Sequence, residues 1–198
     1  MLLPKVEGAD EVARAVSALD AAGARQNPAL WCMIETPKGV LHVEAIAAAS
    51  PRVGALVMGT ADLTKDLRAQ ETKDRAPLLP ALALGLLAAR AYGLAALDGI
   101  HADLGDDEGF EAACRQGRAM GFDGKSLIHP KTIAPANRIF TPSPDELAQA
   151  RRLIAAHDEA LAKSSGVTLV DGRLVERLHV EEARRLLALA AAIAARGR

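Results

Sequence analysis

The chain alternates short apolar runs with amphipathic helical patterns, and this alternation limits the folds that it can adopt. Val12, Val16 and Leu19 illustrate the helical spacing of apolar residues. Strands are expected over residues 1–6, 30–34, 55–58, 94–97 and 125–128, and helices over residues 10–22, 40–49, 78–92, 107–120 and 132–139. Because strands that alternate with helices usually pair in parallel, the pattern predicts an α/β fold with about five βα units.

A Thr-Pro-Ser-Pro stretch interrupts the alternation after residue 140. Ser143 or Asp145 can cap a helix that follows it, Asp171-Gly172 is typical of a hairpin turn, and an amphipathic helix closes the chain. The predicted domains are a catalytic α/β region over residues 1–140 and a helical extension over residues 141–198.

Composition and charge exclude several classes of protein. The 198 residues carry a net charge of -1 and no long basic run, so we expect no nucleic acid partner. Cys32 and Cys114 lie in apolar segments, so we expect them to be reduced residues of the core and the protein to be cytoplasmic. We expect no signal peptide and no membrane-spanning segment, and the glycine-rich motifs of dinucleotide and P-loop sites are absent from the sequence.

Two carboxylates follow neighbouring apolar runs and are the strongest candidates for chemistry. Glu35 comes directly after residues 30–34, and Asp62 comes shortly after residues 55–58. The carboxyl ends of parallel strands meet at one edge of a sheet, where two carboxylates can share a hard divalent cation such as Mg²⁺. The alternative is that Glu35 caps a turn and Asp62 caps the following helix.

Other polar residues follow the remaining predicted strands, and each has two interpretations. Lys5 and Lys125 can face a site, although a salt bridge at the rim is the commoner role of such lysines. His129 can contact a substrate or bond to the backbone, and Asp98 can support a metal site or cap a helix.

Seven short segments match a known family in order and spacing. They are Leu3-Pro4-Lys5-Val6-Glu7, Ile34-Glu35-Thr36-Pro37-Lys38-Gly39-Val40, Gly59-Thr60-Ala61-Asp62-Leu63, Ala96-Leu97-Asp98-Gly99, Gly121-Phe122-Asp123-Gly124-Lys125-Ser126-Leu127-Ile128-His129-Pro130, Phe140-Thr141-Pro142-Ser143 and Val170-Asp171-Gly172-Arg173. Through them the chain resembles the citrate lyase beta-subunit-like branch of the HpcH/HpaI aldolase superfamily, which includes malyl-CoA and citramalyl-CoA lyases.

This resemblance implies a partial TIM (β/α)8-type barrel, with five βα units corresponding to strands 4–8, and a C-terminal helical extension. A complete barrel takes about 250 residues. We therefore expect a shortened gene product, a misplaced start or one half of a split protein. An arginine and an acidic motif that relatives carry on their first three strands have no counterpart in this sequence.

The resemblance also implies roles for particular residues. Glu35 and Asp62 would be the Mg²⁺ ligands. Lys5, Lys125 and His129 would bind substrate, and Asp98 and Glu176 would be catalytic. Glu176 stands where relatives often have an aspartate that reaches a neighbouring subunit, and the equally weighted alternative is a solvated residue before the last helix.

The implied function is a magnesium-dependent carbon–carbon lyase that cleaves a 3-hydroxyacyl thioester, such as citryl-, malyl- or citramalyl-CoA. The thioester would be carried by CoA or by a carrier protein, and the chain would form a trimer or hexamer. The alternative is an inactive truncated homologue that serves as a binding or assembly subunit.

Overall fold

The computed structural model describes residues 1–24, 29–162, 168–170 and 173–196 of the chain. It divides into two compact units, Met1–Phe140 and Thr141–Arg198. The strands of the first unit are β1 (Leu2–Leu3), β2 (Leu30–Ile34), β3 (Val53–Met58), β4 (Ala95–Asp98) and β5 (Gly124–Lys125). Its helices are α1 (Ala9–Ala21), α2 (Pro37–Leu41), α3 (Val43–Ala48), α4 (Thr60–Asp66), α5 (Leu79–Ala91), α6 (Asp107–Met120) and α7 (Ile133–Phe140), with two 3₁₀ turns, η1 (Ala76–Leu78) and η2 (Pro130–Thr132).

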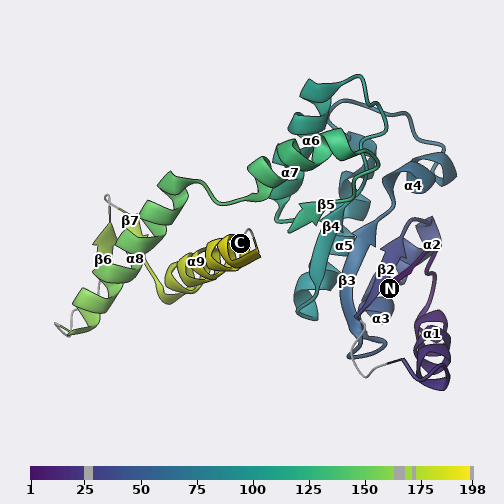
Figure 1. Cartoon of the computed structure of the whole chain (residues 1–198), viewed down its shortest axis with the longest axis horizontal. Helices are drawn as coiled ribbons and strands as arrows, with labels where there is room; N and C mark the ends of the chain where they lie inside the picture. The colour runs from purple at the N-terminus through teal and green to yellow at the C-terminus, as the bar shows by residue number, and fades with distance from the viewer. Residues whose placement is uncertain (25–28, 163–167, 171–172, 197–198) are drawn as a thin grey trace. The chain divides into compact units, whose positions relative to one another are not determined.

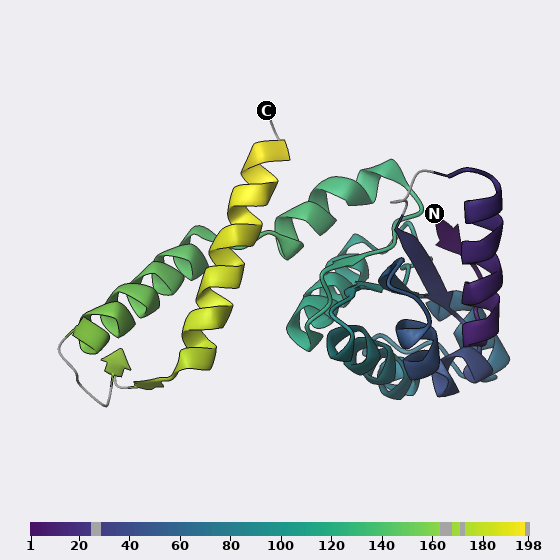
Figure 2. The same cartoon turned by 90° about the horizontal axis from the view of Figure 1, so that it is seen from below.

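The five strands of the first unit form one parallel sheet in chain order, β1-β2-β3-β4-β5 (Figure 1). Helices lie along one side of this sheet, which we call its outer face (Figure 2). On this face α3 and α5 contact β3, α5 contacts β4, and α6 contacts β5. Each strand pairs with the next after a helical connection, as expected of consecutive βα units. The predicted α/β fold with a parallel five-stranded sheet is confirmed.

Several elements of the first unit differ from the prediction: the fifth strand is Gly124–Lys125 and not residues 125–128, and α4 was not among the expected helices. Two of the differences follow from local backbone geometry. The first strand ends at Leu3, since Pro4 has no N–H to donate and Lys5 adopts a left-handed conformation with φ 50°. The helix expected over residues 40–49 is two helices, which meet at His42, where ψ is 11°. The first of them begins at Pro37, and the Thr36 side chain caps it by accepting a hydrogen bond from Gly39 N.

The strands present alternate residues to the helices, and this face carries the core. Cys32, Leu56 and Ala96 are paired neighbours on β2, β3 and β4, and each is at most 1% exposed. Trp31, one residue before Cys32, points to the other face and is 41% exposed. Because side chains alternate along a strand, the outer face is packed under helices while part of the inner face is open.

The second unit consists of two packed helices and a two-stranded hairpin: α8 (Pro144–Ala162), β6 (Thr168–Val170), β7 (Arg173–Val175) and α9 (Arg177–Arg196). Ser143 caps α8 as predicted, through a reciprocal pair of hydrogen bonds with Glu146. The predicted Asp171-Gly172 turn lies outside the described residues.

Two further sequence expectations can be compared with the structure. Cys32 and Cys114 are both buried and free, and burial raises the pKa of the Cys32 thiol to about 11. Among the described residues, none of the helices has the length and apolar character that crossing a membrane requires.

The packing of α5 against the sheet gives a test of the core. Leu82 is fully buried in the core cluster, whereas Leu87 on the same helix is 67% exposed. We expect Leu82→Ala to lower the free energy of unfolding by about 2–5 kcal/mol in urea denaturation, because it leaves a cavity. Leu87→Ala is the matched control, with an expected change below about 0.5 kcal/mol. Equal losses in the two variants would contradict this packing.

Candidate functional site

Glu35 and Asp62 lie at one small pocket at the carboxyl end of the sheet. Glu35 directly follows β2, and Asp62 lies in the first turn of α4, two residues after the first residue of this helix, Thr60. The pocket has a volume of about 210 Å³. Its lining residues are Met33, Glu35, Met58, Gly59, Thr60, Ala61, Asp62, Ile100 and Ser126.

Glu35 is held in place by its neighbours and is 5% exposed. Its Oε1 accepts a hydrogen bond of 2.8 Å from the backbone N–H of Lys5. A Cβ on Gly59 would collide with the Glu35 side chain, so the glycine makes room for this carboxylate. Burial raises the pKa of Glu35, and the charge of Asp62 raises it further.

Asp62 lies beside Glu35 in a more open position. Its Oδ2 is 3.2 Å from Nζ of Lys5, and this interaction lowers the pKa of Asp62. Lys5 therefore contacts both carboxylates, through its backbone to Glu35 and through its side chain to Asp62.

The chemistry of this pair fits a hard divalent cation. Two neighbouring carboxylates repel each other, and in this structure the ammonium of Lys5 supplies the compensating positive charge at Asp62. Among the described residues, no group of three or more His, Cys, Asp or Glu side chains is placed so that it could hold a metal ion. Two carboxylates with the remaining positions left to water and substrate is a common arrangement for Mg²⁺.

Asp98 lies on the opposite face of the sheet from this pocket. It is fully buried and faces α6, where a Cβ on Gly117 would come within 2.7 Å of its Oδ2. Arg75 donates to both carboxylate oxygens, at 2.9 and 2.7 Å, and Nζ of Lys125 donates to Oδ2 at 3.0 Å. The backbone N–H of Gly99 donates to Oδ1. Every oxygen of Asp98 is thus occupied by a partner within the protein.

The sequence interpretation placed Asp98 and Lys125 at the rim with Glu35, and the structure does not bring them there. The side chains of Asp98 and Lys125 are 0% exposed, so a substrate in the pocket cannot touch either in this arrangement. Burial lowers the pKa of Lys125. The difference comes from strand register. Asp98 pairs with Lys125, and both side chains point to the helix-covered face, whereas the next residue, Ser126, lines the pocket.

Arg75 is the residue of this cluster that sequence reasoning missed. It lies in the connection between α4 and η1, in a left-handed conformation with φ 56°. Its Nε donates to Gln116 on α6, so its guanidinium fastens this connection to both β4 and α6. No local signal marks such a residue, since its partner Asp98 is 23 positions away in the sequence.

His129 and Glu176 have local roles in the structure. His129 is exposed and caps η2, its Nδ1 accepting a hydrogen bond of 3.1 Å from Lys131 N. Glu176 is exposed in the second unit, and its backbone N–H donates to Nδ1 of His179. Their predicted roles toward a substrate stay predictions.

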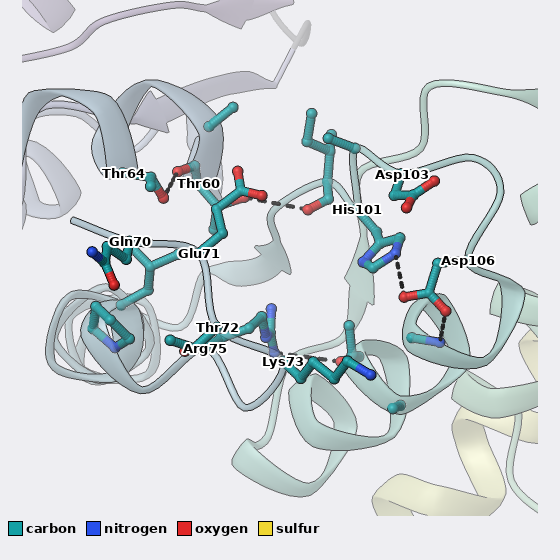
Figure 3. Close-up of a pocket in the computed structure, with 18 of the residues that line it drawn as sticks. Thr60, Thr64, Gln70, Glu71, Thr72, Lys73, Arg75, His101, Asp103 and Asp106 are labelled. Atoms are coloured by element: carbon teal, nitrogen blue, oxygen red, sulfur yellow. Dashed lines mark hydrogen bonds and ion pairs between the residues drawn. The ribbon is translucent and has the colours of Figure 1, made fainter. Parts of the chain in front are cut away.

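A larger pocket of about 750 Å³ lies between α4, the connection that follows it, and α6 (Figure 3). It shares Thr60, Ala61 and Ile100 with the small pocket, so the two adjoin. Figure 3 shows Thr64, Gln70, Glu71, Thr72, Lys73, Arg75, His101, Asp103 and Asp106 around it.

Acidic groups dominate the charge of the larger pocket. Its carboxylates are Glu71, Asp103, Asp106 and Glu108. Two of its cations are already paired, Arg75 with Asp98 and Arg115 with Glu111.

A family model now places this geometry among known proteins. The HpcH/HpaI aldolase/citrate lyase model matches residues 1–130, which include both pocket carboxylates. The chain belongs to the HpcH/HpaI aldolase/citrate lyase family. The resemblance inferred from the sequence segments is confirmed.

Curated relatives of this chain in Cereibacter sphaeroides carry two different names. A (3S)-malyl-CoA thioesterase is 48% identical over 195 residues, which cover 98% of this chain and 66% of the relative. An L-malyl-CoA/beta-methylmalyl-CoA lyase is 35% identical over 216 residues, which cover 98% of this chain and 68% of the relative. The chain thus spans about two thirds of the length of the relatives it matches.

Solved structures of this family share the fold. CitE from Mycobacterium tuberculosis, crystallised in complex with magnesium, acetoacetate and coenzyme A, is 30% identical with a TM-score of 0.78, covering 96% of this chain and 67% of that chain. A citrate lyase from Burkholderia xenovorans has a TM-score of 0.80 at 22% identity, over 100% of this chain and 64% of that chain. The predicted partial TIM-type barrel with a helical extension is confirmed as the fold class.

The buried cluster around Asp98 leads to a contrast between two substitutions. Asp98→Ala leaves two buried cations without their carboxylate, and we expect it to lower the free energy of unfolding by about 3–5 kcal/mol. Lys125→Met keeps the Arg75–Asp98 pair and the side-chain length, so the expected change is below about 1.5 kcal/mol. Urea denaturation measures both, and equal losses would show that the ion cluster is not what stabilises this region.

Proposed function

We propose that the Glu35–Asp62 pocket binds Mg²⁺ and, through it, the hydroxy-acid end of a malyl-type CoA thioester. The observation that carries the proposal is the pair of carboxylates at one small pocket, with a lysine ammonium supplying positive charge beside them. The magnesium and coenzyme A in the CitE complex support the same choice of cation and thioester.

The residues of this chain would act mainly by holding the cation and, through it, orienting the thioester. Glu35, buried and fixed by the Lys5 backbone, gives a ligand with little freedom to move. Asp62 gives a second ligand from the first turn of α4. When bound, Mg²⁺ supplies Lewis-acid polarisation and a template for a hydroxyl and a carboxylate.

The reaction that this geometry supports best is carbon–carbon cleavage. With the hydroxyl and carboxylate held together, a base would take the hydroxyl proton and the adjacent Cα–Cβ bond would break, leaving its electron pair on the acyl fragment as an enolate. Return of a proton to that carbon would give acetyl-CoA beside glyoxylate. Asp98 is enclosed on the other face of the sheet and is not available for this proton transfer. Glu176, in the second unit, remains our candidate for acid–base catalysis.

Thioester hydrolysis is the second candidate, because the 48% identical relative is a thioesterase. It would begin from the same bound thioester but would release malate and free CoA. Product analysis distinguishes the two reactions, since only cleavage yields glyoxylate. Formation of neither product, with the metal bound, would instead favour the binding or assembly role.

Replacement of a pocket carboxylate tests the proposal. We expect Glu35→Gln to abolish Mn²⁺ binding in calorimetry and to lower turnover of malyl-CoA by about a hundredfold, because the amide keeps the size but removes the charge. Glu44→Gln on α3 is a matched control at an exposed position and should change neither. Retention of both Mn²⁺ binding and turnover by Glu35→Gln would overturn the site.

A further inference from the structure

Lys5 makes two different contacts with the two pocket carboxylates. Its backbone N–H donates to Oε1 of Glu35 at 2.8 Å, and its Nζ lies 3.2 Å from Oδ2 of Asp62. Both contacts come from a residue two positions beyond the end of β1. One residue therefore connects the carboxylate that follows β2 with the carboxylate on α4.

The backbone of Lys5 is in a conformation that lysine adopts rarely. Its φ of 50° lies in the left-handed region, which costs a side-chain-bearing residue stability. Such a conformation persists when the surrounding structure holds it, and sites of this kind cluster at functional positions. Here the hydrogen bond to buried Glu35 holds it.

The two ends of this arrangement differ in their exposure to solvent. Glu35 is almost fully buried, whereas the side chains of Lys5 and Asp62 are 58% and 39% exposed. An exposed ion pair contributes little to stability and can exchange partners readily. The Lys5–Asp62 pair can thus open without disturbing the core, while the bond from Lys5 N to Glu35 stays in place.

Charge explains why such a pair is useful at this position. The charge of Asp62 acts on Glu35 and raises its pKa, and the Lys5 ammonium, 3.2 Å from Oδ2 of Asp62, compensates part of that repulsion. A divalent cation between the same two carboxylates would meet the ammonium at short range, and the two positive charges would repel each other.

We propose that the Lys5 ammonium is an internal counter-ion that occupies Asp62 in the metal-free protein and is displaced when a divalent cation binds. This inference rests on the proposed metal site at Glu35 and Asp62. It adds that Lys5 weakens the affinity of the site for metal, and that metal loading frees the Lys5 side chain.

Metal titration of lysine variants tests the inference, with Mn²⁺ as the probe and free Mn²⁺ followed by electron paramagnetic resonance. We expect Lys5→Met to bind Mn²⁺ about fivefold more tightly than wild type, because the metal no longer has to displace an ammonium from Asp62. Lys5→Arg keeps the charge and should bind close to wild type. Lys38→Met is the matched control, since Lys38 is similarly exposed at 63% and pairs with Glu7 at 3.3 Å.

A second measurement follows the lysines themselves. Acetylation of Lys5 by acetic anhydride, quantified by mass spectrometry, should become faster when Mn²⁺ is added to wild type, while acetylation of Lys38 should not change. This readout does not depend on activity or on any variant.

The outcomes separate this inference from the proposed function. If wild type binds Mn²⁺ and Glu35→Gln does not, but Lys5→Met binds no more tightly than wild type, the counter-ion role is overturned and the metal site stands. If neither wild type nor Lys5→Met binds Mn²⁺, the site and the counter-ion role both fail. Tighter binding by Lys5→Met, with faster labelling of Lys5 in wild type, supports the inference.

Discussion

The two-residue period of the parallel strands is the constraint on which the rest of this structure depends. On β2, Ile34 enters the helix-covered core and the next residue, Glu35, enters the pocket. The same step separates Lys125, buried beside Asp98, from Ser126, which lines the pocket. Because a shift of one residue would exchange the two faces, both the pocket and the buried cluster exist only in this register.

The two faces use acidic and basic side chains for different purposes. On the core side, Asp98 is enclosed by Arg75 and Lys125, and opening that cluster would leave buried charges unpaired. On the pocket side, Asp62 and Lys5 are partly exposed, so their pair can open at little cost. Solvent access, and not residue type, therefore decides which carboxylate is structural and which is available to a ligand.

Much of the fold could be predicted from the sequence, because apolar periodicity reports directly on burial. The strands were found in order, and the helix over residues 107–120 was found with its bounds, since Asp106 and Gly121 mark its two ends. Helix α4 and the bounds of the first and fifth strands were missed, as was the break at His42. The end of the first strand and the break depend on single backbone conformations, at Lys5 and His42, that no repeating pattern reports.

The sequence by itself determined that apolar runs and helices alternate, that Glu35 follows a strand, and that the family segments occur in order. Only the tertiary structure decided which polar residues share a site, because that depends on strand register and on partners far away in the chain. Asp98 shows the difference: its position after an apolar run is local, but its burial under Arg75 comes from a residue 23 positions away. Lys5 is a second example of this difference. Its position near a strand end can be read from the sequence, but only the folded backbone brings its N–H to Glu35 and its ammonium to Asp62.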